Sequence, residues 1–67
     1  MYPNLNAEQA RFGHTNQYVA SLLDLSRRSY EIKKENATFK IKEFQKLCEV
    51  YNCKFEYLFD NNIHKTF

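Results

Sequence analysis

The chain has 67 residues and a formal net charge of +2, which suits one small domain with a limited core. Its single glycine and single proline disfavour a turn-rich β-sandwich. No apolar run approaches the ~18 residues that a membrane-spanning helix needs. The first residues lack the basic and apolar regions of a secretory signal peptide, so we expect a cytoplasmic protein.

Positive charge is concentrated in the middle of the chain. Residues 26–46 contain seven Lys or Arg and three Glu, a local net charge of +4, whereas the remainder has a net charge of −2. A basic middle suits an anionic ligand on one face. An ordinary solvated helix face carries the same kind of residues, so charge alone leaves both interpretations open.

The first predicted helix runs from about Leu5 to Phe12, and these two apolar residues fall on one side of it. Asn4 is the expected cap of this helix. Gly13 follows, and its tolerance of the left-handed conformation makes it the expected residue at the helix end.

Two short helices are predicted next, over about Asn16–Leu23 and about Arg27–Lys34. Thr15 and Ser26 stand immediately before them, and their hydroxyl groups can cap them. The turn between the helices is about four residues long. A short helix, a tight turn and a second helix that opens with two arginines are typical of a pair that enters the DNA major groove.

Three expected helix ends carry an Asx residue, namely Asp24, Asn36 and Asn52. Asx side chains tolerate the left-handed backbone conformation better than other non-glycine residues. This tolerance allows a chain with one glycine to make several tight turns.

The fourth predicted helix is the most clearly amphipathic part of the chain. It follows a connector at residues 37–39 and begins after Thr38 or Lys40. Apolar residues recur there at the spacing of one buried stripe, which consists of Ile41, Phe44, Leu47, Cys48 and Tyr51. A last short amphipathic turn carries Phe55, Leu58 and Phe59. We expect a single domain over residues 1–60 and a short tail at residues 61–67.

No arrangement of reactive residues predicts an enzyme. His14 and His64 are far apart in the sequence, and the two cysteines lack a nearby histidine pair, which disfavours a zinc site. Cys48 and Cys53 are expected to be small reduced apolar residues, with a disulfide as the alternative. Because the chain also lacks a glycine-rich phosphate loop and a nucleophile motif, we expect no metal, no cofactor and no small-molecule substrate.

The order of these segments resembles the lambda-repressor-like, Cro-type (XRE-type) helix-turn-helix family, and in particular small regulators of phages of Gram-positive bacteria. The resemblance implies a compact, all-α, five-helix domain that binds a double-stranded DNA operator and regulates a lysis–lysogeny switch in the bacterial host cell. It also implies a homodimer, or two cooperating monomers, on half-sites about one helical turn apart. It is carried by NLNAEQAR, GHTNQYVASLL, LSRRSY, FKIKEFQKL and NCKFEYLF.

The same resemblance implies a set of DNA-contacting residues. Asn16 would meet a phosphate at the start of the second helix, and Arg27 and Arg28 would open the recognition helix beside base edges. A good Arg–guanine pair discriminates by ~1–3 kcal/mol. Two cations at a helix N-terminus are mildly unfavourable unless an anion is near, which favours DNA contact. The alternative is that both arginines are solvated residues of the first turn. The implied set is Asn16, Gln17, Ser26, Arg27, Arg28, Glu31, Ile32, Lys33 or Lys34, Thr38 and Lys40.

The chain departs from the family pattern at several positions. Asp24 replaces a usual glycine before the recognition helix, and Lys54 replaces the serine that usually caps the last helix. Gln9 and Lys34 replace an apolar pair or an Arg–Glu pair, so we expect a Gln9–Lys34 contact or a Glu8–Lys34 salt bridge.

Ile32 occupies a place where a polar base-reading residue is common. It could contact a thymine methyl group, remain a single exposed apolar residue, or join Tyr18 and Leu22 in a patch that binds protein. The last possibility predicts another function, a modulator that binds the DNA-binding domain of the phage repressor. The possible protein interface, which includes a dimer contact through the C-terminal aromatic residues, is Tyr18, Leu22, Ile32, Phe55, Tyr57, Phe59, Ile63 and Phe67.

Overall fold

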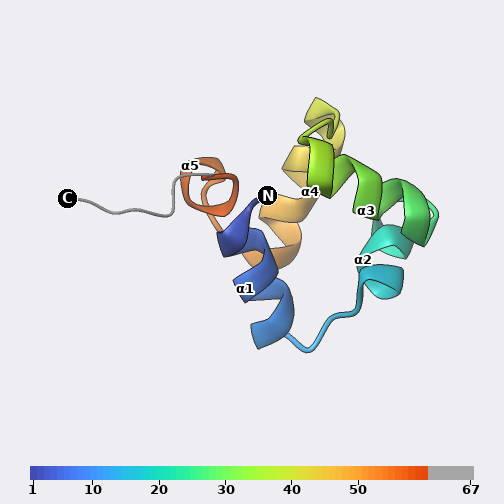
Figure 1. Cartoon of the computed structure of the whole chain (residues 1–67). Helices are drawn as coiled ribbons and strands as arrows, with labels where there is room; N and C mark the ends of the chain where they lie inside the picture. The colour runs from blue at the N-terminus through green and yellow to red at the C-terminus, as the bar shows by residue number, and fades with distance from the viewer. Residues whose placement is uncertain (61–67) are drawn as a thin grey trace.

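The computed structural model describes residues 1–60, which form an all-α domain without strands. The predicted fold class is therefore confirmed. Figure 1 shows α2 and α3 together at one side of the molecule, with α5 beside the start of α1 at the other. The predicted tail at residues 61–67 lies outside the described residues. The helices are α1 (Pro3–Arg11), α2 (Asn16–Leu22), α3 (Arg27–Asn36), α4 (Ile41–Tyr51) and α5 (Phe55–Leu58).

Hydroxyl caps start α2 and α3 at the predicted residues. The Thr15 Oγ1 accepts a hydrogen bond from the Tyr18 backbone N–H at 3.0 Å. The Ser26 Oγ accepts one from the Ser29 backbone N–H at 3.1 Å. Each bond satisfies one of the N–H groups that a helix start leaves without an intrahelical partner, so both capping predictions are confirmed.

Four helices end with the same backbone motif. In each, a left-handed residue is followed by an N–H that bonds the carbonyl oxygen five residues earlier, at 2.9–3.1 Å. Gly13, Asp24 and Asn52 are left-handed as predicted, with φ of 71°, 60° and 51°. The fourth left-handed residue is Ala37, with φ of 58°.

The end of α3 therefore differs from the prediction. Asn36 was expected to be left-handed, but it is the last helical residue, and Ala37 takes the left-handed conformation instead. The bond from the Thr38 N–H to the Lys33 carbonyl oxygen, 3.0 Å long, fixes the end at this position. An alanine there carries the Cβ strain that a glycine would avoid.

The start of α1 also differs from the prediction. The helix begins at Pro3, whose fixed φ and missing N–H suit a first helical position. Asn4 is inside the helix and is not its cap. Its side-chain amide donates instead to the Tyr57 carbonyl oxygen at 2.7 Å, which ties α1 to α5.

The core lies between all five helices, but the apolar stripe predicted for α4 is only partly inside it. Leu47 and Tyr51 are buried as predicted, whereas Ile41 is 73% exposed, so its assignment to the stripe was wrong. Phe39 from the connector is buried in place of Ile41, and its ring lies 5.7 Å from those of Tyr30 and Phe44. The remaining core residues are Tyr2, Leu5, Val19, Ala20, Tyr30, Leu58 and Phe59.

Cys48 and Cys53 are free thiols, each partly buried beside the core, which agrees with the predicted reduced state. Burial raises the pKa of the Cys48 thiol. Among residues 1–60, no helix has both the length and the apolar character to cross a bilayer.

Candidate nucleic-acid interface

The helix pair α2 and α3 is joined by residues 23–26, and the Leu25 N–H bonds the Ala20 carbonyl oxygen at 2.9 Å across this turn. Val19 and Ala20 of α2 and Tyr30 of α3 have no exposed surface. These buried residues set the angle between the helices and leave the first turn of α3 outside the core.

Arg27 and Arg28 lie on this exposed first turn. The Arg27 side chain is 62% exposed, and its Nε lies 3.5 Å from the Glu31 Oε2. Arg28 is exposed and has no ion pair within residues 1–60. Ser26 takes up only the Ser29 N–H, so the earlier N–H groups of the helix are open to an anion.

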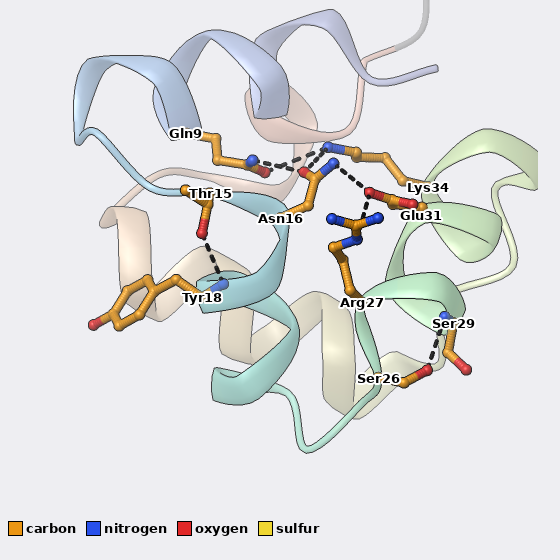
Figure 2. A network of polar contacts seen from close by, with 9 residues as sticks. All are labelled: Gln9, Thr15, Asn16, Tyr18, Ser26, Arg27, Ser29, Glu31 and Lys34. Atoms are coloured by element: carbon orange, nitrogen blue, oxygen red, sulfur yellow. Dashed lines mark hydrogen bonds and ion pairs between the residues drawn. The ribbon is translucent and has the colours of Figure 1, made fainter.

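Asn16 starts α2, but its side-chain amide is taken up by the protein itself (Figure 2). Its Oδ1 accepts from the Gln9 Nε2 at 2.8 Å and from the Lys34 Nζ at 2.9 Å. Its Nδ2 donates to the Glu31 Oε2 at 3.0 Å. The expected contact of this side chain with phosphate would therefore require these bonds to break, whereas the backbone N–H groups of Asn16 and Gln17 precede the one that Thr15 caps and are still available.

Lys34 belongs to the same network. Its Nζ lies 3.4 Å from the Gln9 Oε1 and 4.9 Å from the centre of the Tyr30 ring. Burial lowers the pKa of Lys34. The predicted Gln9–Lys34 contact is confirmed, and Lys34 points into the molecule, away from the position expected of a phosphate-binding residue.

Glu8 does not form the alternative salt bridge with Lys34. Its carboxylate accepts from the Arg11 Nη2 at 2.6 Å and from the Tyr57 hydroxyl at 3.1 Å. The hydrogen bond from Arg11 lowers the pKa of the Glu8 carboxyl. Arg11 is on the same helix as Glu8, whereas the bond from Tyr57 joins α1 to α5, so the Glu8 carboxylate takes no part in the α2–α3 face.

Lys33 is also held internally. Its Nζ lies 3.2 Å from the Glu43 Oε1, and the two side chains are only 19% and 12% exposed. The same Glu43 oxygen accepts the Lys40 backbone N–H at 2.8 Å, so one carboxylate joins the end of α3 to the start of α4. The Lys40 side chain itself is exposed. A glutamate three residues after a helix cap is a known capping signal, and it could have identified Glu43 from the sequence.

Gln17 and Thr38 are exposed as a DNA-contacting role requires. Gln17 lies in the first turn of α2, and Thr38 lies in the connector after α3.

The apolar residues expected to form a patch are not brought together in any recorded contact within residues 1–60, and the Tyr18 ring packs on His14, 4.7 Å away, on the side of α2 that faces away from Arg27 (Figure 2). Tyr18 and Ile32 are 48% and 47% exposed, whereas Leu22 is half-buried. A groove of about 780 Å³, which no sequence pattern indicated, lies between the end of α2 and the start of α4. Its lining includes Leu23, Phe39, Lys40 and Ile41.

The C-terminal aromatic residues are divided between the surface and the core. Phe55 and Tyr57 are exposed, but Phe59 is buried against Tyr2 and Phe44, so it belongs to the core rather than to an exposed interface. The predicted interface residues Ile63 and Phe67 lie outside the described residues.

Within residues 1–60, no group of three or more His, Cys, Asp or Glu side chains could hold a metal ion. Comparisons with protein-family models, with curated proteins and with solved structures found no match. Any functional conclusion therefore depends on the geometry of the α2–α3 face and on the sequence resemblance.

Proposed function

We propose that the chain binds double-stranded DNA sequence-specifically and inserts α3 into the major groove. The observation that carries this proposal is the pair of exposed arginines, Arg27 and Arg28, on the first turn of α3. With 10 residues, α3 is about 15 Å long, and the major groove of B-DNA, ~12 Å wide, admits a helix. Arginine is the side chain that best matches the O6 and N7 acceptors of guanine.

Contacts with the DNA phosphates would flank the two arginines at the start of α3. The N-termini of α2 and α3 both offer unpaired N–H groups, and the helix dipole favours phosphate at both. Lys40, exposed at the start of α4, adds a cation beyond the end of α3. Phosphate contacts of this kind fix the register of a protein on DNA, while base contacts supply the specificity.

The biological setting follows from the resemblance to Cro-type regulators. We propose a regulator of a phage lysis–lysogeny switch that acts in the bacterial cytoplasm. Two copies would bind half-sites about 34–36 Å apart, which is the separation that places two recognition helices on one side of the duplex.

A mobility-shift assay on duplex DNA flanking the gene tests this function. The double variant Arg27→Ala/Arg28→Ala should lose binding and keep its helical circular-dichroism signal. The matched control Lys46→Ala/Lys54→Ala removes the same charge from α4 and the loop before α5, and it should keep most of the binding. Equal binding by the arginine variant and the parent would refute the assignment of α3.

A second candidate function is favoured by a specific observation: Lys33 and Lys34 are paired internally, whereas Tyr18 and Ile32 are exposed. A face with fewer free cations and more apolar surface suits a protein partner such as the DNA-binding domain of a phage repressor. The same assay separates the two functions. A modulator would shift no DNA alone and would change the shift that the repressor produces.

A further inference from the structure

We infer that Glu31 is a positioning residue, which holds Arg27 as the base-reading arginine and leaves Arg28 to contact the DNA backbone. This inference rests on the proposed DNA-binding function and deepens it. It divides the roles of two adjacent residues that the sequence alone treats as equivalent.

The Glu31 carboxylate lies between the two helices of the pair. Its Oε2 accepts the Asn16 Nδ2 hydrogen bond at 3.0 Å and lies 3.5 Å from the Arg27 Nε (Figure 2). Asn16 is on α2 and Arg27 is on α3. Through Glu31, the position of the arginine side chain therefore depends on the neighbouring helix α2. Arg28 has no such partner within the described part of the chain.

The orientation of the Asn16 amide is itself determined by charge. Its oxygen faces the Lys34 ammonium at 2.9 Å and the Gln9 Nε2 at 2.8 Å, whereas its nitrogen faces the Glu31 carboxylate. A reversed amide would place an NH₂ group against an ammonium and an oxygen against a carboxylate. Only one orientation satisfies all three partners, so Glu31 is held by a fixed donor.

The contact with Glu31 leaves the useful edge of Arg27 free. The carboxylate lies at the Nε side of the guanidinium, and the Arg27 side chain is 62% exposed. The two Nη groups can therefore form the two parallel bonds that guanine O6 and N7 accept. A guanidinium held before binding loses less rotamer freedom when it docks, which favours base reading over general attraction.

Glu31 also has an effect on DNA affinity in general. Its side chain is 41% exposed, so its negative charge opposes every nearby phosphate. Removal of this charge should strengthen binding to arbitrary DNA and at the same time weaken the discrimination between bases. A residue with a merely structural role would not produce these opposite changes.

The test is selection from a pool of duplexes with random sequence, followed by binding to an enriched and to an unselected duplex. The parent should enrich guanine at one position of each half-site. Glu31→Gln should reduce that preference at least threefold and should bind the unselected duplex as tightly as the parent or tighter. The matched control Glu35→Gln removes an exposed carboxylate from the same helix and should keep the guanine preference.

Arg28→Gln supplies the opposite control. It should keep the guanine preference and lower the slope of log affinity against log salt by about 0.9, the value for one lost phosphate contact. In the absence of DNA, the Arg27 Nε resonance should differ between the parent and Glu31→Gln, because the carboxylate charge 3.5 Å from it is removed. This second measurement detects the positioning contact directly.

If Glu31→Gln retained the full guanine preference, the inference would be overturned and the DNA-binding function would stand. The same would follow if Arg28→Gln alone lost the guanine preference. A parent chain that enriches no sequence and retains no duplex would overturn the proposed function, and the inference with it. The two failures are therefore distinguishable.

Discussion

Two lysines that contact Glu43 in different ways should respond differently to the same substitution. Glu43 binds the side chain of Lys33 but only the backbone N–H of Lys40, whose ammonium is free. Lys40→Gln should therefore remove one phosphate contact, and Lys33→Gln should remove none. Both variants lose one positive charge, so their comparison separates the availability of a cation from net charge.

The magnitudes follow from the salt dependence of a phosphate contact. Each contact contributes about −0.9 to the slope of log affinity against log salt. Over a fourfold change from about 50 to about 200 mM salt, one contact corresponds to a factor of about 3.5 in affinity. Between these two salt concentrations, the affinity of Lys40→Gln for DNA should fall by a factor about 3.5 times smaller than that of the parent. The affinity of Lys33→Gln should fall by the same factor as that of the parent.

For stability, Lys33→Gln should have the larger effect and Lys40→Gln the smaller. The Lys33–Glu43 pair is mostly buried, so its loss should lie between the value for an exposed pair and that for a fully buried one, about 1–2 kcal/mol. For a domain of this size, this destabilisation corresponds to a fall of roughly 5–15 °C in the melting temperature of Lys33→Gln. Lys40→Gln should melt close to the parent.

Fluorescence anisotropy with a labelled duplex that the parent retains, measured in a salt series below the melting temperature of each variant, gives the slopes. Thermal unfolding followed by circular dichroism gives the stabilities. An equal decrease in slope for both variants would show that Lys33 leaves Glu43 to contact DNA, and the structural argument would be refuted.

Three further predictions concern stability, each measured by urea unfolding. Burial raises the pKa of Tyr51 to about 12 from 10.0, so the stability that this group contributes below pH 10 should be lost between pH 10 and 12. Tyr51→Phe should therefore lose less stability than the parent in that window, by on the order of 2 kcal/mol after solvent screening is allowed for, and an identical pH profile would contradict this. Ala37→Gly should stabilise the domain by about 0.5 kcal/mol, because relief of left-handed strain exceeds the added chain entropy, and a loss of stability would show that the packing of the methyl group matters more. Tyr30→Phe should cost about 1 kcal/mol at neutral pH, because the buried Tyr30 hydroxyl donates to the Gln9 Oε1 at 2.8 Å; an unchanged stability would mean that this bond has no net effect.

Local signals were sufficient to predict most helix boundaries. Thr15 and Ser26 act on N–H groups three residues away, and Asp24 and Asn52 act on their own backbone, so neighbouring residues determine the outcome. The end of α3 was less predictable because Asn36 and Ala37 are adjacent, and the end of a helix is decided by which backbone bond closes it.

The partners of the charged residues were harder to predict from the sequence than the helix boundaries. Periodicity indicated that Lys33 and Lys34 lie on α3, but their orientations depend on where α1 and α4 cross that helix. Lys33 meets Glu43 ten residues later, and Lys34 meets Gln9 on the first helix, so the candidate site has fewer free cations than the sequence indicated. The exposure of Ile41 has the same origin, because the stripe pattern does not say where a helix leaves the core.

The single satisfied orientation of the Asn16 amide has a consequence for how the sequence can change over evolution. Because that amide is matched to a cation at Lys34 and an anion at Glu31, a reversal of either charge alone would place like groups together. We expect homologues to vary residues 9, 16, 31 and 34 in concert. A change of operator preference by substitution at Arg27 would then often be accompanied by substitutions in this set, which includes two residues outside the recognition helix.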